Sequence, residues 1–254
     1  MIRALPPIRL VFFISYFSAL IAFSSQSSSD HSFHIVLDPG HGGSDLGATR
    51  DSFIESKIVF QITQKIKANL DQQKNIITTL TRNKVQGLSL KDRVQIANDL
   101  KADLFVSLHA NTSNSESVRG MEFYFNSPNA SGNLRQSVTK NHFPTSSEVI
   151  EKIKNDFQFY DKTERSLRLA KSLKTAQEQK SSITGADKSM IKSTIKRAPF
   201  HVIENTTMPA ALVELGFISN RREAKKLTTE NYQTEIAGLL TAAILEYKEK
   251  SDKP

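Results

Sequence analysis

The sequence predicts a single α/β domain in which a mostly parallel central sheet of about six strands is flanked by helices on both faces. One observation is that short β-branched or apolar segments alternate with longer segments whose apolar residues recur at helical spacing. Another is that 254 residues can bury one large core but are few for two domains. The third is that the chain has no cysteine and no internal repeat, so the core has to stabilise the fold without disulfides.

The first thirty residues have the pattern of a secretory signal. Arg3 and Arg9 precede an apolar segment at 10–23, and a small polar tract follows at 24–29. Charged, apolar and small-residue regions in this order predict a signal peptide from residue 1 to about 24, with a short linker to 29, and export to the periplasm or cell envelope. An uncleaved membrane anchor is the alternative, although about fourteen apolar residues are few for a bilayer span.

A short apolar segment, 35–37, predicts the first strand, and a glycine-rich turn that contains His41 follows it. Glycine allows positive φ angles and the close approach of other groups, so this turn displays the histidine rather than packing it. The turn lacks both the G-x-x-x-x-G-K-[ST] and the G-x-G-x-x-G patterns of phosphate-binding loops. On this stretch alone, a ligand or catalytic histidine and an ordinary loop histidine fit equally well.

Helices and strands then alternate along the chain. Residues 53–72 have apolar side chains at helical spacing, which predicts an amphipathic helix with Glu55 in its first turn. A carboxylate there either complements the helix dipole or belongs to a site. Ser89 and Asp92 have the spacing of a capping box and predict the start of a second helix. Strands are predicted at 76–81, at 104–109, which ends in His109, and at 120–125.

Residues 126–163 form a polar insertion that is long for a connection in a compact domain. A second capping pattern, Thr145 with Glu148, predicts a helix at 145–159 inside it. The apolar side of this helix would consist of Val149, Ile150, Ile153 and Phe157.

A further helix is predicted at 166–179, and a basic loop follows it. Residues 171–197 contain seven basic and two acidic residues. They form either a solvated face or a surface that attracts an anionic polymer such as cell wall. Nucleic acid is not an expected partner, because the chain has no recognisable nucleic-acid-binding motif.

The C-terminal part is predicted to contain strands at 200–203 and 210–216 and helices at 220–227 and 232–248. The second of these strands is apolar except for one charge, Glu214. An ionised glutamate in a buried apolar strand is costly unless it is paired or functional. Glu214 is therefore either half of a buried salt bridge or part of a site.

Polar residues lie at the C-terminal ends of three predicted strands, namely His41, His109 and Glu214. In open α/β sheets the site lies outside these ends, and Glu55 belongs to the same edge, so the four side chains are expected to converge. Two imidazoles and one carboxylate with an open fourth position form a catalytic zinc arrangement, and the remaining carboxylate would serve as the base. The H-E-x-x-H signature is absent, which excludes a helix-borne metalloprotease site.

Four motifs, in order along the chain, carry a resemblance to a known family. They are Leu-Asp-Pro-Gly-His-Gly-Gly at 37–43 with Gly47 and Ala48, then Glu55, then Ser-Leu-His-Ala-Asn at 107–111, then Met-Pro-Ala-Ala-Leu-Val-Glu-Leu-Gly-Phe-Ile-Ser-Asn at 208–220. Together they resemble the motifs of the zinc-dependent N-acetylmuramoyl-L-alanine amidases of the bacterial cell wall. The resemblance implies a catalytic domain at 30–250, one Zn²⁺ per chain held by His41, Glu55 and His109, and Glu214 as the catalytic glutamate.

The activity implied by this resemblance is hydrolysis of the amide bond between N-acetylmuramic acid and the L-alanine of the stem peptide, in peptidoglycan. Such a protein is expected to be monomeric and to act in cell-wall remodelling or daughter-cell separation. Two alternatives stay open: another zinc amide hydrolase on stem peptides, such as a carboxypeptidase, and a non-catalytic wall-binding protein on the same scaffold. The segment before Ala198 departs from the Asp-Arg-Gly of many relatives. Asp38 and Asp45 are expected either to orient His41 or to cap the turn.

Many relatives carry an insertion where this chain has residues 126–163, and in some of them a helix covers the zinc until an activator protein displaces it. The resemblance therefore implies an autoinhibitory helix at 145–159, with Glu148 or Glu151 in the open zinc position, and an activator protein as partner. A substrate-binding lid and an inert surface helix are the alternatives.

Overall fold

A computed structural model describes residues 32–126, 145–183 and 193–251. The predicted signal peptide and linker at 1–29 lie outside these residues, and so do residues 127–144 of the predicted insertion. Among the helices that are described, none combines the length and hydropathy needed to span a lipid bilayer.

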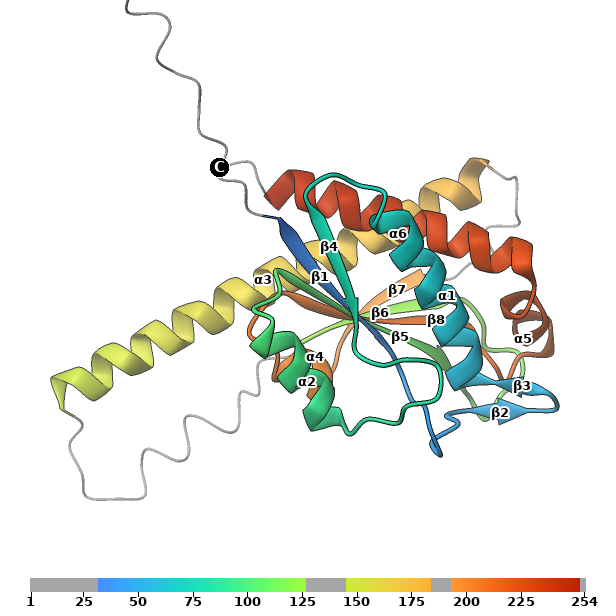
Figure 1. Ribbon diagram of the computed structural model, residues 1–254, viewed down its shortest axis with the longest axis horizontal. Helices are drawn as coiled ribbons and strands as arrows, with labels where there is room; N and C mark the ends of the chain where they lie inside the picture. The colour runs from blue at the N-terminus through green and yellow to red at the C-terminus, as the bar shows by residue number, and fades with distance from the viewer. Residues whose placement is uncertain (1–31, 127–144, 184–192, 252–254) are drawn as a thin grey trace, which may run out of the picture. The chain divides into compact units, whose positions relative to one another are not determined.

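Six strands form the central sheet in the order β4-β1-β5-β8-β6-β7 (Figure 1). Neighbouring strands are parallel except for β6 and β8, so the predicted fold class is confirmed. A separate two-stranded hairpin, which the sequence did not predict, joins β2 (Thr49–Arg50) to β3 (Phe53–Ile54). The strands of the central sheet are β1 (Phe33–Pro39), β4 (Ile76–Leu80), β5 (Leu104–Asn111), β6 (Met121–Phe125), β7 (Ser193–Arg197) and β8 (Ala210–Phe217).

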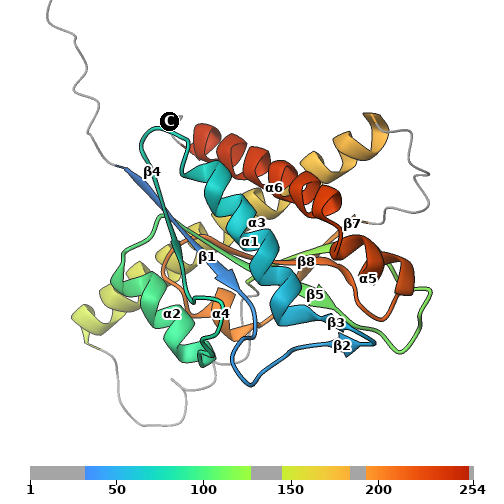
Figure 2. The same cartoon turned by 45° about the vertical axis from the view of Figure 1, so that its right-hand side comes forward.

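Helices cover both faces of the sheet, as predicted (Figures 1 and 2). Because side chains alternate along a strand, β1 contributes Ile35 and Leu37 to one core and Val36 to the other. The first core contains residues of α1 (Glu55–Leu70), α3 (Ser146–Ile183) and α6 (Glu230–Ser251). The second contains residues of α2 (Leu90–Asp99) and α4 (His201–Glu204), while α5 (Arg221–Leu227) follows β8.

The sixth strand differs from the one that the sequence predicts. Residues 200–203 were expected to be a strand, but 201–204 form the short helix α4, which buries Val202 and Ile203. The sixth strand is β7, in the stretch predicted to be a basic loop, and it pairs in parallel with β6 at the edge of the sheet. Because β7 lies at the edge of the sheet, it has a neighbouring strand on one side only. It forms from largely polar and exposed residues, which carry little strand signal in the sequence.

The two helices predicted at 145–159 and 166–179 are one continuous helix, α3, of 38 residues. Residues 160–165 contain neither proline nor glycine, and one of their charged side chains is anchored in the fold: Lys162 is buried and its Nζ donates to the carbonyls of Ile203 and Glu204. The capping pattern at Thr145 and Glu148 is confirmed by reciprocal hydrogen bonds.

The two halves of α3 have different surroundings. In the C-terminal half, Leu169, Ala170 and Leu173 are buried in the core. In the N-terminal half, the predicted apolar side is exposed, with Ile150 66% and Phe157 72% accessible. Figures 1 and 2 show this half extending beyond the sheet.

Candidate metal and catalytic site

Three predicted ligands meet at the C-terminal edge of the parallel strands. His41 is in the turn after β1, Glu55 is the first residue of α1, and His109 is near the end of β5. The parallel register pairs Pro39 with Leu108, which brings the ends of β1 and β5 together. One ligand atom from each of the three side chains lies within 4.8 Å of the others. The convergence predicted from the sequence is therefore present.

Glu55 is at the centre of this group. Its Oε1 is 3.1 Å from His41 Nε2, 3.0 Å from His109 Nδ1 and 3.0 Å from the Ala110 amide nitrogen. Its Oε2 accepts a hydrogen bond from the Ala48 amide at 2.7 Å. Burial alone would raise the pKa of Glu55, but the hydrogen bonds and charges of His109 and His41 hold it well below its usual value. The buried carboxylate is thus ionised and fixed on both oxygens.

His41 is held by its second nitrogen. Its Nδ1 is 2.8 Å from Asp45 Oδ2, and Asp45 Oδ1 accepts from the Gly47 amide at 3.0 Å. Burial alone would lower the pKa of His41, but the hydrogen bonds and charges of Glu55 and Asp45 raise it to about 9. A carboxylate on the far nitrogen can orient a metal-binding imidazole, and the bond from the Gly47 amide caps the turn, so the contacts of Asp45 fit both of the roles predicted for it.

Asp38 is not in contact with the His41 ring. Its buried carboxylate forms an ion pair with Arg93 Nη1 at 2.7 Å and accepts hydrogen bonds from the hydroxyls of Thr81 and Ser107. Of the two predicted orienting carboxylates, Asp38 therefore binds Arg93 and two hydroxyl groups, while Asp45 binds the imidazole.

Two glycines make room for the ligands. A Cβ on Gly40 would lie 2.3 Å from His109 Cε1, and one on Gly47, where φ is +67°, would lie 2.6 Å from Glu55 Oε2. Real Cβ contacts are not this short, so both positions require glycine for space. The glycines predicted to display His41 thus admit the side chains of the two other ligands.

Glu214 lies beside the ligand group on the neighbouring strand. It is paired with His109 in the parallel register of β5 and β8, and with Glu122 in the antiparallel register of β6 and β8. Its Oε2 is buried and has no hydrogen-bond partner among the described residues. Burial raises the pKa of Glu214 to about 7. An unpartnered carboxylate oxygen next to the ligands favours a functional glutamate over a buried salt bridge.

The three ligands fit a divalent metal ion. Two imidazole nitrogens and one carboxylate oxygen are the donor set of catalytic zinc sites, and Asp45 and the Ala48 amide support two of the donors from outside the group. Glu214 is outside this ligand group, so its carboxylate is not one of the three candidate donors.

The sequence did not predict the polar cluster around Glu122. Its carboxylate accepts hydrogen bonds from Asn111 Nδ2 at 3.1 Å, the Tyr124 hydroxyl at 2.6 Å and Lys196 Nζ at 2.6 Å. The alternation of the 120–125 strand places Glu122 and Tyr124 on one face. The pairing of β6 with β8, which puts that face beside Glu214, has no signal in the sequence.

The N-terminal half of α3 is not part of the site in this structure. Glu148 and Glu151 are exposed and do not belong to the ligand group. Where α3 meets the sheet, Gln158 and Lys162 border a cavity with Asp103 and Pro209, the residues that precede β5 and β8. That is the N-terminal edge of the strands, opposite the ligands, so the predicted inhibitory contact would need another arrangement of α3.

Comparisons with known proteins agree with this geometry. A sequence profile of the family described as N-acetylmuramoyl-L-alanine amidase matches residues 35–246. The chain is 31% identical over 229 residues to the N-acetylmuramoyl-L-alanine amidase AmiC of Escherichia coli O6:H1, which covers 87% of this chain and 54% of AmiC. The chain therefore spans about half the length of that relative.

Solved structures show the same fold. The catalytic domain of the N-acetylmuramoyl-L-alanine amidase CwlV from Bacillus (Paenibacillus) polymyxa var. colistinus superimposes with a TM-score of 0.66 at 28% identity, over 85% of this chain and 98% of that domain. An N-acetylmuramoyl-L-alanine amidase from Clostridium difficile gives a TM-score of 0.66 at 25% identity, over 88% and 100% of the two chains.

Proposed function

The chain belongs to the N-acetylmuramoyl-L-alanine amidase family, and we propose that it is a zinc-dependent peptidoglycan hydrolase. It would cleave the amide bond between N-acetylmuramic acid and the L-alanine of the stem peptide, in cell-wall remodelling or daughter-cell separation. The observation that supports this most directly is the unpartnered Oε2 of Glu214 beside the His41, Glu55 and His109 group. Binding the cell wall without catalysis would not require a buried carboxylate that has no partner.

His41, Glu55 and His109 would hold one zinc ion per chain. A zinc ion at this place supplies Lewis-acid polarisation of the scissile carbonyl and lowers the pKa of water at the site. Asp45 keeps the imidazole of His41 in one orientation through Nδ1, so that Nε2 faces Glu55. The ionised and fully hydrogen-bonded Glu55 keeps negative charge where a cation binds.

Glu214 would carry the proton. As a base, it accepts a proton from the attacking water, whose oxygen forms the new bond to the carbonyl carbon. As the C–N bond breaks, it returns that proton to the departing alanine nitrogen. A carboxyl group whose pKa is raised to about 7 suits both steps, because it gains and loses a proton near neutral pH.

Two variants test this assignment. Glu214→Gln should bind zinc as the parent does and lose activity by about 10²- to 10⁴-fold, because the amide cannot accept the proton. His41→Ala should lose both zinc and activity, since it removes a ligand. Glu164→Gln on the exposed surface of α3 is the matched control and should change neither. Near-parental turnover in Glu214→Gln would refute the role of Glu214.

Export and regulation belong to the same proposal. The pattern at 1–29 supports secretion to the periplasm or envelope, where peptidoglycan lies. The activator protein and the inhibitory role of the 126–163 insertion stay predictions. Deleting 129–161 tests them: faster hydrolysis by the deletion variant supports inhibition, and an unchanged or slower rate argues against it.

A further inference from the structure

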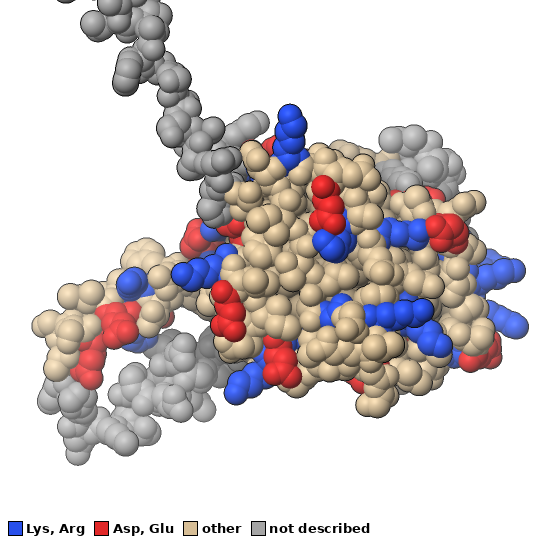
Figure 3. Space-filling view, in the orientation of Figure 1, with Lys and Arg blue, Asp and Glu red and all other residues tan. Residues whose placement is uncertain are grey.

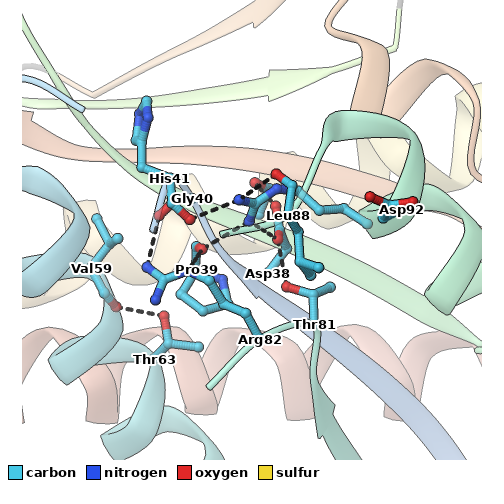
Figure 4. A network of polar contacts seen from close by, with 12 residues as sticks. Asp38, Pro39, Gly40, His41, Val59, Thr63, Thr81, Arg82, Leu88 and Asp92 are labelled. Atoms are coloured by element: carbon cyan, nitrogen blue, oxygen red, sulfur yellow. Dashed lines mark hydrogen bonds and ion pairs between the residues drawn. The ribbon is translucent and has the colours of Figure 1, made fainter. Parts of the chain in front are cut away.

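Two buried arginines bind the backbone of the turn that carries His41. Arg82 and Arg93 are each 3% exposed. They come from different parts of the fold, since Arg82 follows β4 and Arg93 lies on α2. Figure 4 shows the Arg82 guanidinium beside the carbonyl groups of Pro39 and Gly40, with the His41 ring pointing away on the other side of its backbone.

Arg82 links two of the ligand-bearing segments. Its Nε donates to the Pro39 carbonyl at 2.7 Å, and its Nη2 donates to the carbonyls of Gly40 at 2.9 Å and Ser56 at 3.0 Å. Gly40 precedes His41, and Ser56 follows Glu55. One rigid guanidinium plane therefore fixes the distance between the turn and the start of α1.

Arg93 binds the same turn from the other side. Its Nη1 donates to Asp38 Oδ1 at 2.7 Å and to the Pro39 carbonyl at 3.0 Å, and its Nη2 donates to the His41 carbonyl at 2.7 Å. Asp38 is fixed in turn by Thr81 Oγ1 at 2.6 Å and Ser107 Oγ at 2.7 Å. The carbonyls of three consecutive residues, 39 to 41, thus all accept hydrogen bonds from buried guanidinium groups.

Burying two arginines and holding His41 at a positive φ both cost free energy of folding, which indicates that these features have a specific role. Two guanidinium cations are buried with one carboxylate, Asp38, in contact, and their other hydrogen bonds are to backbone oxygens. His41 itself has φ of +57°, a left-handed conformation that is unfavourable for a residue with a Cβ. Such a conformation persists only where its surroundings determine it, and the Arg93 bond to the His41 carbonyl does so directly.

We propose that Arg82 and Arg93 are positioning residues of the metal site, which hold the His41 backbone so that its imidazole is oriented before a metal ion binds. The inference rests on the proposed function only in that it takes the His41, Glu55 and His109 group to bind a metal ion. Lysine cannot reproduce these contacts, because all its donors are on one nitrogen, whereas each arginine donates from separate nitrogens of a rigid plane to acceptors that lie apart.

The test compares Arg82→Lys and Arg93→Lys with the parent in the full chain. Zinc affinity is measured by competition with a chromophoric chelator, ligand geometry by the visible absorption spectrum of the Co²⁺-loaded protein, and folding by urea unfolding without metal. We expect zinc affinity to fall by about 10- to 100-fold, as for other residues that orient metal ligands. We also expect an altered Co²⁺ spectrum, which a loss of stability alone does not cause.

Lys162→Met is the matched control. Lys162 is also a buried cation whose Nζ donates to three backbone carbonyls, those of Ile203, Glu204 and Thr206, but it lies at the opposite edge of the sheet. This variant should unfold at lower urea concentration and yet keep the parental zinc affinity and Co²⁺ spectrum.

The proposal is overturned if both arginine variants bind zinc within about twofold of the parent, or if Lys162→Met loses as much affinity as they do. Should neither arginine variant fold, Thr81→Val takes their place, because it removes only the bond to Asp38 Oδ1. It must weaken zinc binding, and unchanged affinity overturns the proposal. A parent chain that binds no zinc would instead contradict the proposed function, so the two failures are distinguishable.

Discussion

Replacing Gly40 by alanine should disrupt the metal site through a single methyl group. The added Cβ would lie 2.3 Å from His109 Cε1, 2.4 Å from Nε2 and 2.7 Å from Nδ1, whereas ordinary contacts begin at 3.4 Å. The imidazole has to move by about 1 Å, which is the shift that relieves such overpacking. That movement breaks the 3.0 Å contact between His109 Nδ1 and Glu55 Oε1.

We expect Gly40→Ala to cost about 1–3 kcal/mol of unfolding free energy and to weaken zinc binding by about 10- to 100-fold. The measurements are urea unfolding and chelator competition. Gly238→Ala is the matched control, because a Cβ at this exposed position of α6 meets nothing within 4 Å. It should stabilise the helix by about 0.5–1 kcal/mol and leave zinc binding unchanged. Parental zinc affinity in Gly40→Ala would refute the packing argument and with it the placement of His109.

Three further predictions concern other parts of the chain. Asp45→Asn should weaken zinc binding by about tenfold in chelator competition, with unfolding free energy within about 0.5 kcal/mol of the parent, because Asp45 is exposed and asparagine keeps an oxygen that can accept from the Gly47 amide; equal affinity would contradict this. Calorimetry should find that Leu173→Ala costs about 2–5 kcal/mol, while Phe157→Ala, at an exposed position of the same helix, costs less than about 0.5 kcal/mol; similar costs would show that the N-terminal half of α3 is packed. Burial lowers the pKa of Lys162 to about 8, and an unfolded lysine titrates near about 10.4, so the unfolded chain binds more protons between these values and stability should rise with pH there by up to about 1.4 kcal/mol per unit; urea unfolding of Lys162→Met should lack this component, and an identical slope would argue against it.

The sequence was sufficient to predict helices and strands whose formation depends on their own residues. The periodicity of 53–72, the capping box at Ser89 and the strand patterns predict α1, α2 and five of the six sheet strands near their observed bounds. His41, Glu55, His109 and Glu214 could be placed together because the C-terminal ends of strands in such a sheet share one edge.

The sequence was not sufficient to predict elements whose formation depends on contacts with distant parts of the chain. The largely polar residues 193–197 become a strand because β6 offers an edge, and 201–204 become a helix because Val202 and Ile203 pack on the second core. The two predicted helices join into α3 around Lys162, whose Nζ donates to the Ile203 carbonyl 41 residues away, a contact that the sequence does not reveal. The arrangement of Arg82 around the turn is equally long-range, since its acceptors belong to residues 39, 40 and 56.

Mass spectrometry of purified peptidoglycan after digestion by the zinc-loaded chain, with Glu214→Gln as the control, distinguishes the proposed amidase from its alternatives. We expect release of intact stem peptides that begin with a free L-alanine amine, together with glycan strands whose lactyl groups carry no peptide. We expect no such products from Glu214→Gln. Release of single terminal amino acids would indicate a carboxypeptidase, and an unchanged wall after treatment with the loaded parent protein would contradict the amidase assignment.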